Sequence, residues 1–597
     1  MKTSYNSIPK YAWVLLVGFL SGLCSCVDYL DKSPDSDITS EEIFSTFNKY
    51  QGFVEDIYEH VVQLAVGSGA TFNFNFGGDE VICSSTSTIS GWVERGDFWQ
   101  WSSGTPFNNS STPGSGTRGQ GFWGSGWYAI RKANMAINNI DQLLNATQEE
   151  KNILLGQAYF FRAYMHFEIL RCWGHIAYID VVYSPNDIIR PETQTYRYVA
   201  DKIEEDLLTA IPLLPEDWDK TVVGLATLGN NAGRVTKGAA LAYLGLNRLY
   251  AASPLMHGEE TGNFQTYNTQ LCQLAAEAYY EVIKLADQGV YILQPWTDYR
   301  RNFWTDETTD RPILSKEIIW SNVPHDQCRW LYADHLIDQV SDWNIYSSPT
   351  DNYVHYFGMA NGLPIDEPDS GWDPNNPWVN REPRFYYNIV CDGDRLAYTQ
   401  EDDGTNDAVH RFYVGGRHRG ENNSHGGYGY KKFLAPGWNT VDNWWNDNIY
   451  FDCPKVRLAG VYLEYAEAAN EAWGPNGGVP GGITAVQAVN IVRARAGVPD
   501  VDARFLTNKE TFREIIRQER AVELAFEAHR WHDLRRWYIA DQLKYREKYA
   551  LEFDEGHTYF QRSLYVTTVF EPKHWWLPFL INQHTAISPV FKQNPGW

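Results

Sequence analysis

The chain has 597 residues, of which 43% are hydrophobic and 21% are charged, a composition that excludes a disordered protein and is typical of an ordered globular one. Its formal net charge of −24 disfavours nucleic acid and other polyanions as partners, because the mean field of the protein repels them. The 24 tryptophans and 37 tyrosines favour a ligand with an apolar face and polar edges, since these side chains combine both characters.

The N-terminus has the features of an export signal. Two lysines precede a short apolar run over residues 13–23, which is too short to span a bilayer. The stretch "LCSC" that follows resembles the lipobox of bacterial lipoproteins, in which cleavage precedes a cysteine that becomes acylated. We therefore expect a lipoprotein signal peptide over residues 1–25, lipidation of Cys26 with Cys24 as the weaker alternative, and an acidic, acylated tether over residues 26–39.

Hydrophobic periodicity predicts helices along much of the chain. The predicted helices cover residues 40–66, 121–144, 151–174, 196–214, 234–253, 269–288, 456–473, 484–496 and 510–540. Gly174 is predicted to end the third of them, and Thr236 to cap the start of the fifth. The helices come in pairs, which favours a stack of helix pairs, although no 34-residue repeat is evident.

The segment between about 296 and 450 has a different character. Pro, Gly, Asn and Asp are frequent there, and the strands that it predicts, such as "SKEIIWSN", are short. Loops on a rigid helical scaffold are a usual place for binding residues. This segment is therefore expected to form a loop-rich surface.

Acidic residues recur on two of the C-terminal helices. They are Glu464, Glu467 and Glu471 on the first, and Glu519, Glu523 and Glu527 on the second. Closely spaced carboxylates could serve acid–base chemistry or hold a metal ion. Arginines are abundant around both groups, among them Arg520, Arg530, Arg535 and Arg536, so that salt bridges between helices are the favoured interpretation.

The sequence predicts no cofactor. His529 and His532 form an HxxH pair without the glutamate of the HExxH zinc motif. The cysteines after residue 26 are widely spaced and contain no CxxC, so they are expected to be buried small side chains or occasional disulfides. No GxSxG, phosphate loop or dinucleotide fingerprint occurs in its required context. A structural Ca2+ ion is left open.

Six stretches carry a resemblance to a known family. They are "GQAYFFRAYMHFEILRCWG", "GRVTKGAALAYLGLNRLYAAS", "VRLAGVYLEYAEAANEA", "NIVRARAG", "IRQERAVELAFEAHRWHDLRRW" and "FKQNPGW". In order and spacing they resemble the SusD/RagB family of nutrient-uptake lipoproteins of Bacteroidetes over nearly the whole chain. Gly460 and Ala521 depart from residues that are frequent in the family, and both positions lie on predicted scaffold helices.

The resemblance implies a mainly α fold, in which a tetratricopeptide-like helix-pair scaffold carries a large loop-rich face and a few short strands. It implies a single domain over residues 40–597. The scaffold would comprise mainly residues 40–66, 121–290 and 456–540, and the binding face mainly residues 70–120 and 296–450.

The resemblance also implies a function. Such a protein would be lipid-anchored at the cell surface in the outer membrane, would not be an enzyme, and would capture oligosaccharides or polysaccharide for a SusC-like TonB-dependent transporter. The net charge favours a neutral glycan. A peptide-binding RagB-like uptake lipoprotein and a surface glycoside hydrolase remain as alternatives.

The tryptophan-rich stretch over residues 91–127 supplies the predicted sugar platform. An indole stacks on the apolar C–H face of a pyranose while neighbouring polar side chains bind its hydroxyls. The predicted glycan-binding residues of this stretch are Trp92, Trp99, Trp101, Arg95, Asp97, Asn108 and Asn109. Trp123 and Trp127 are assigned to a scaffold helix instead. A second predicted group, by analogy with the corresponding loops of family members, is Trp330, Tyr332, Trp343 and Tyr346.

Overall fold

The computed structural model describes most of the chain. The described residues are 40–61, 77–83, 89–99, 122–184, 186–187, 190–305, 312–321, 347–395, 409–420, 423–434, 450–579 and 590–597. The predicted signal peptide, Cys26 and the tether lie outside them. No helix among the described residues is long and apolar enough to span a membrane.

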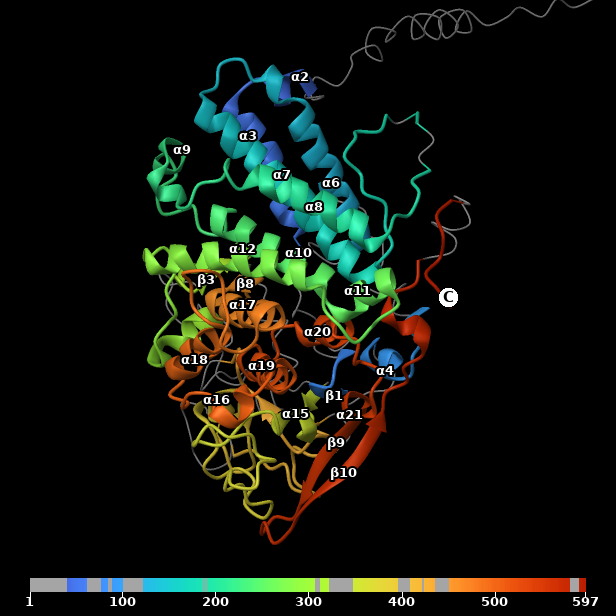
Figure 1. Cartoon of the computed structure of the whole chain (residues 1–597), viewed down its shortest axis with the longest axis vertical. Helices are drawn as coiled ribbons and strands as arrows, with labels where there is room; N and C mark the ends of the chain where they lie inside the picture. Colours follow the sequence, from blue (N-terminus) through green and yellow to red (C-terminus); the bar gives the residue numbers. More distant parts are fainter. Residues whose placement is uncertain are drawn as a thin grey trace, which may run out of the picture.

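Helices dominate the structure, as the sequence predicts (Figure 1). The longer ones are α3 (Phe47–Glu55), α6 (Phe122–Asn138), α7 (Gln148–Trp173), α8 (Tyr196–Ala210), α10 (Lys237–Ala252), α11 (Pro254–Thr261), α12 (Thr269–Asp287), α17 (Leu458–Trp473), α18 (Ala485–Arg495) and α19 (Lys509–Glu523). The shorter ones are α2 (Ser40–Ile43), α4 (Ile89–Glu94), α9 (Val222–Leu225), α15 (Asp351–Val354), α16 (Pro383–Asn388), α20 (Arg530–Arg536) and α21 (Leu543–Arg546).

The long helices stack in sequence order. Helix α6 packs on α7, α7 on α8, α8 on α10, α10 on α12, and α12 on α17, which also contacts α18 and α19. Figure 1 shows this stack running from the top of the molecule to its middle, with the loops and the β9–β10 hairpin below it. The predicted helix-pair scaffold is therefore confirmed.

Local signals explain the ends of the long helices. Helix α7 begins at a capping box, in which Thr147 accepts from the backbone N–H of Glu150 and the Glu150 side chain accepts from that of Thr147. It ends at Gly174, whose φ of +75° favours glycine. Thr236 caps α10 by accepting from the backbone N–H of Ala239. The predictions for Gly174 and Thr236 are confirmed.

The prediction of one helix over 510–540 is wrong. Helix α19 ends at Glu523, and α20 begins only at Arg530. Between them Phe526 and Ala528 adopt φ angles of +63° and +66°, which end a helix. Lys432 Nζ accounts for part of this turn, because it donates to the carbonyl oxygens of Glu523 at 2.9 Å and of Ala525 at 3.1 Å. Periodicity carries no information about such a distant partner.

The first predicted helix, over 40–66, is also divided. It consists of α2, α3 and a 3-10 helix, Asp56–His60, and residues 62–66 lie outside the described part of the chain. Phe44, Tyr50 and Val54 pack with Leu143 and Leu154 of the α6–α7 pair in a small separate core. The N-terminal segment is thus fastened to the top of the stack.

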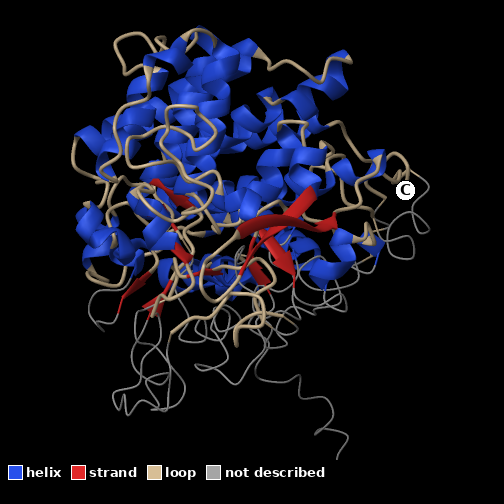
Figure 2. Ribbon diagram, turned by 90° about the horizontal axis from the view of Figure 1, so that it is seen from below, coloured by secondary structure: helices blue, strands red, loops and turns tan. Residues whose placement is uncertain are grey.

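Short antiparallel strand pairs hold the loop-rich part together (Figure 2). Among the described residues they are β1 (Val81–Cys83) with β4 (Ser347–Pro349), β2 (Trp304–Thr305) with β7 (Tyr450–Phe451), β3 (Ile318–Trp320) with β8 (Val456–Arg457), β5 (Ile389–Val390) with β6 (Gly429–Tyr430), and β9 (Glu547–Phe553) with β10 (Phe560–Thr567). Apart from the last, a hairpin, and β5–β6, these pairs join segments more than a hundred residues apart. The five described cysteines after residue 26 are buried, as small core side chains.

Candidate ligand-binding face

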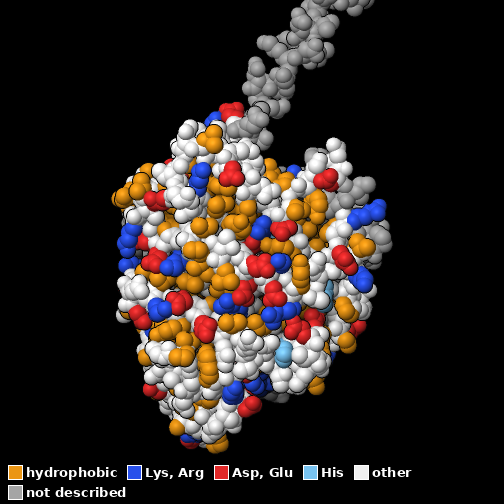
Figure 3. All heavy atoms as spheres, turned by 45° about the horizontal axis from the view of Figure 1, so that its top comes forward, with side chains coloured by type: hydrophobic (Ala, Val, Ile, Leu, Met, Phe, Trp, Pro, Cys, Tyr) orange, Lys and Arg blue, Asp and Glu red, His pale blue; other side chains and the backbone are white. Residues whose placement is uncertain are grey.

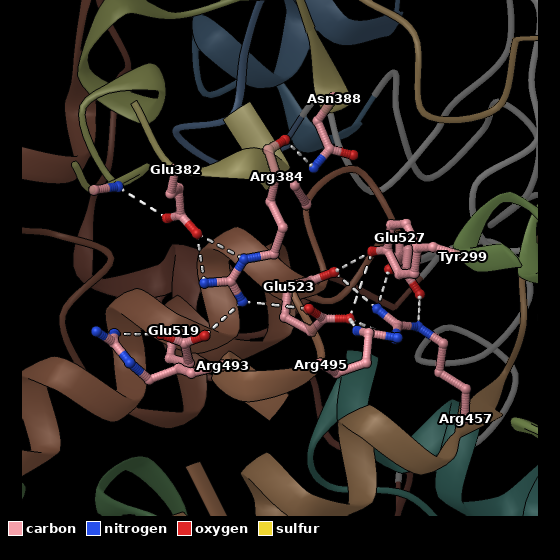
Figure 4. Close-up of polar contacts among 12 residues, drawn as sticks. Tyr299, Glu382, Arg384, Asn388, Arg457, Arg493, Arg495, Glu519, Glu523 and Glu527 are labelled. Atoms are coloured by element: carbon pink, nitrogen blue, oxygen red, sulfur yellow. Dashed lines mark hydrogen bonds and ion pairs between the residues drawn. The ribbon is translucent and has the colours of Figure 1, made fainter. Parts of the chain in front are cut away.

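A buried ionic network joins the scaffold to the loop-rich part (Figure 4). Its members are Glu317, Arg384, Lys432, Arg457, Arg493, Arg495, Glu519, Glu523 and Glu527. None of these side chains is more than 8% exposed. They come from α16, α18, α19 and the turn after it, from β8, and from the segments that flank β3 and β6. The network therefore fixes the loops on the helices.

Glu523 lies at the centre of this network. Its carboxylate accepts from Arg457 Nη1 at 2.8 Å and from Arg384 Nη1 at 3.3 Å, and it also pairs with Arg495. Burial alone raises the pKa of Glu523, but the surrounding guanidinium groups outweigh it and hold the pKa well below the usual range. The carboxylate is therefore favoured in its charged form and committed to structural partners.

The acidic residues of α17 are also structural. Arg520 donates to Glu464 at 3.1 Å, and the guanidinium of Arg536 donates to both carboxylate oxygens of Glu467. Arg513 forms a two-pronged pair with Glu471, with both bonds at 2.6 Å. The assignment of these acids to salt bridges between helices is confirmed, and none of them is placed for acid–base chemistry on a ligand.

The histidine pair lies at the start of α20, with His529 as its partly buried N-cap residue and His532 buried within it. Burial and neighbouring arginines lower the pKa of His529 to about 3 and that of His532 well below its usual value. Within the part of the chain that the structure describes, no group of three or more His, Cys, Asp or Glu side chains is arranged to hold a metal ion. The predicted binding face is therefore the candidate functional site.

The first half of the predicted sugar platform is anchored on the C-terminal part of the chain. Phe98 is buried, and its ring packs against those of Trp531, His574 and Trp597. Trp99, the next residue, is 37% exposed and meets the ring of Trp597 edge-to-face, with centroids 5.4 Å apart. Trp99 is therefore the exposed residue of this aromatic cluster.

The backbone of this segment, residues 89–99, is held from several sides. Glu94 on α4 pairs with Lys548 at 2.9 Å, and its carbonyl oxygen accepts from the backbone N–H of Val569 at 2.8 Å. Gly96 turns the chain with a φ of +76°, in a place where a Cβ would lie 2.9 Å from Val569. The platform is thus built on fixed elements, which suits precise stacking.

The predicted platform residues that the structure describes lie within two turns of one another. Trp92 lies on α4 and is partly buried against the core, Arg95 is exposed, and Asp97 donates its backbone N–H to the carbonyl oxygen of Trp92 at 2.9 Å. Outside the described residues lie Trp101, Asn108, Asn109, Trp330, Tyr332, Trp343 and Tyr346. Those seven stay predictions. Trp123 and Trp127 lie on scaffold helix α6, as expected.

A cleft that the sequence analysis missed lies on the other side of the β9–β10 hairpin. It has a volume of about 360 Å3 and is bordered by α15, α19, α21 and the hairpin. Its lining includes Asn352, His355, Asp366, Glu514, Arg517, Lys544, Glu547, Tyr549 and Arg562. Alternation along β9 separates the two places, because Lys548 points to α4 whereas its neighbours on either side line the cleft.

The cleft combines aromatic and polar groups. The guanidinium of Arg562 lies over the ring of Tyr549, 4.8 Å from its centroid, and pairs with Asp351 at 2.6 Å. Asn352 accepts from the backbone N–H of Tyr549, while its Nδ2 has no hydrogen-bond acceptor among the described residues. The same holds for Nε of Arg517. These two nitrogens are closed off from solvent, so it is the other charged and amide groups of the lining, beside the ring, that suit a ligand rich in hydroxyl or carbonyl groups.

Sequence reasoning could not find this cleft. Its lining comes from segments up to two hundred residues apart, and no two of its polar residues form a recognisable motif. A hint lies in "EKYALEF" and "FQRSLYV", where tyrosines and charged residues alternate at strand spacing.

The architecture identifies the class of protein. A tetratricopeptide-like helix stack that carries a loop-rich face with few short strands is the SusD-like fold. A model described as "SusD family" matches residues 316–597, and one described as "Starch-binding associating with outer membrane" matches residues 28–250. The chain belongs to the SusD/RagB family.

Individual relatives and solved structures match most of the chain at low sequence identity. SusD-like protein P2 of Formosa agariphila is 25% identical over 446 residues, which cover 71% of this chain and 72% of the relative. A SusD-like protein from Bacteroides fragilis superposes with a TM-score of 0.71 at 23% identity, covering 95% of this chain and all of that one. A SusD-like carbohydrate binding protein from the same species has a TM-score of 0.64 at 18% identity, with 92% of this chain and all of that chain covered.

Proposed function

We propose that this protein is a lipid-anchored glycan-binding protein of the outer membrane. It captures oligosaccharides or polysaccharide at the cell surface and delivers them to a SusC-like TonB-dependent transporter. The observation that carries this proposal is the match of both halves of the chain to SusD-family models, one of which is described by starch binding and the outer membrane. The similar structure from Bacteroides fragilis that is described as a SusD-like carbohydrate binding protein supports it.

The site chemistry fits capture without turnover. The buried carboxylates of α17 and α19 form salt bridges with arginines. Glycoside hydrolysis requires two carboxyl groups that face each other across an open site, and these described acids at the centre of the fold are not arranged in that way. Trp99 instead offers an exposed ring on a fixed support. We assign glycan contact to Trp99 and to the other predicted residues of the two aromatic groups.

The cleft supports a second candidate function. Side chains of both charge signs line it, among them Lys544, Arg517 and Asp366. A peptide, with its two termini and its backbone amides, matches such a mixed lining better than a neutral sugar does. A RagB-like peptide-binding role is therefore kept beside the glycan-binding one.

Titration calorimetry separates the two roles. Wild-type protein is titrated with a panel of neutral oligosaccharides and with a mixture of short peptides, and then Trp99→Ala and Tyr549→Ala are compared. Glycan binding at the platform predicts that Trp99→Ala weakens affinity about five- to a hundredfold, on the scale of about 1–3 kcal/mol for one stacked aromatic ring, with an unchanged melting temperature. Tyr198→Ala, at an exposed tyrosine of scaffold helix α8, is the matched control.

Three outcomes would contradict the glycan proposal. The first is that no glycan of the panel binds, and the second is that Trp99→Ala binds as tightly as Tyr198→Ala. The third is the appearance of new reducing ends on incubation, which would show a hydrolase. Peptide binding that Tyr549→Ala abolishes would establish the second candidate instead.

A further inference from the structure

Three aliphatic side chains stand out on the surface of one short segment of the scaffold. Val222, Leu225 and Leu228 are 74%, 58% and 61% exposed, and they lie within and directly after α9. We call these three residues the apolar knob. Figure 1 shows α9 projecting from the side of the helical stack, near the end that carries α2 and α3. Figure 3 brings this end forward and shows hydrophobic side chains on its surface.

The shape of this segment is fixed by polar contacts. Asn231 Nδ2 donates to the carbonyl oxygen of Gly224 at 2.9 Å, and Thr227 Oγ1 donates to Asn231 Oδ1 at 2.7 Å. The backbone N–H of Val222 donates to Glu149 Oε1 at 2.9 Å, which ties the segment to the first turn of α7. These contacts hold the apolar knob on the protein surface, although burial of its side chains would stabilise the fold.

The described chain begins at the same end of the scaffold. Glu149, the partner of the knob segment, lies just after the turn that contains Leu144, which is 81% exposed. Leu143, beside it, packs with Phe44 in the small core under α2. The knob, Leu144 and the N-terminal helix are thus gathered around the start of α7.

The predicted anchor lies a short distance along the chain from this end. Thirteen residues, 27–39, separate Cys26 from Ser40, the first residue of α2. A chain of that length spans at most about 50 Å, and about 20 Å on average if it is flexible. An acyl group on Cys26 would therefore keep this end of the molecule within reach of the membrane surface.

We propose that the apolar knob and Leu144 insert into the interface of the lipid bilayer that holds the anchor. This inference rests on the anchoring part of the proposed function. Apolar burial drives the contact, since the charged residues beside the knob, Asp217, Asp219 and Lys220, are mainly acidic and do not attract anionic headgroups. The knob has no aromatic or arginine side chain of the kind that dominates protein interfaces, which favours lipid over a protein partner.

A contact of this kind would orient the protein. A single acyl anchor leaves the body free to swing on its tether, whereas a second apolar contact beside it restricts that motion.

Depth-dependent fluorescence quenching tests the proposal. Leu225→Cys and, as a matched control, Leu564→Cys on the exposed face of β10 are labelled with an environment-sensitive dye in the full-length acylated protein. The protein is reconstituted in phosphatidylcholine vesicles that contain spin-labelled lipid. We expect strong quenching of the dye at position 225, at least several times that at position 564. Equal quenching at the two positions would overturn the proposal.

Further variants separate lipid contact from the other outcomes. Changing Val222 and Leu228 to Ser in the protein labelled at position 225 is expected to reduce the quenching of the dye, because the remaining knob no longer inserts. Burial of the dye only when a partner protein is added would assign the knob to that partner and overturn the lipid proposal. Palmitate incorporation and glycan affinity, measured on the same proteins, report the anchor and the proposed function separately, so each can fail by itself.

Discussion

Removal of the Glu527 carboxylate is expected to leave the buried Lys432 ammonium without its carboxylate partner, and to take one of three carboxylates from Arg457. Glu527 is 1% exposed, and it accepts from Lys432 Nζ at 2.5 Å and from Arg457 Nε at 2.8 Å. The Lys432 side chain is fully buried, and burial lowers its pKa although Glu527 opposes that change. Breaking a buried pair by removing one partner costs about 3–5 kcal/mol. We expect Glu527→Ala to lose stability in this range.

Urea unfolding followed by circular dichroism measures this loss, and Asp369→Ala is the matched control. Asp369 pairs with Arg504 at 2.7 Å on the surface, where both side chains are well exposed, so the same type of substitution should leave the unfolding midpoint unchanged. The double variant Glu527→Leu/Lys432→Met should recover part of the loss, because the lysine charge that lost its carboxylate is also gone. Equal midpoints for Glu527→Ala and Asp369→Ala would refute the reasoning, as would an unaltered midpoint together with lost ligand binding.

Two other substitutions test the fold. Burial raises the pKa of Glu80 from 4.5 to about 8, so the wild-type protein loses stability as the pH rises towards 8. Glu80→Gln does not titrate, and its free energy of unfolding relative to wild type should therefore rise by about 3 kcal/mol between pH 5 and pH 8 in urea unfolding. A difference that does not vary with pH would contradict this. Gly174→Ala should cost more than Gly262→Ala in calorimetry: both glycines end helices with φ near +76°, but only at Gly174 would the Cβ meet another side chain, at 2.6 Å from Trp576. Equal melting temperatures would show that the overlap is relieved at no cost.

Much of the scaffold could be predicted from local patterns. The long helices follow from apolar spacing, and the ends of two of them from Thr236 and Gly174, because capping and left-handed glycine act over a few residues. The structural role of the acids on α17 followed from the arginines nearby in the sequence. The family resemblance, carried by six motifs, anticipated the architecture that the matches confirm.

The candidate site was only partly predictable. Tryptophans in a stretch of small polar residues indicated the platform, and Trp99 is exposed in it, but the inward turn of Phe98 onto Trp597 depends on a residue five hundred positions away. The apolar knob is visible in the sequence as "TVVGLATLGN", yet its exposure was not evident there. Whether aliphatic residues in a loop are buried or exposed is known only once their neighbours are known.

The sequence by itself determined where the chain is helical and which segments are loops, because periodicity, caps and turn residues act within one or two turns of the backbone. Only the tertiary structure decided that α19 ends at Glu523. The cation that binds the carbonyl oxygens at this end is Lys432, which lies about ninety residues earlier in the chain. The cleft beside β9 belongs to the same class of feature. Charge pairing and cavity shape depend on contacts between distant segments, and the free energy of those contacts is set by burial that no local pattern encodes.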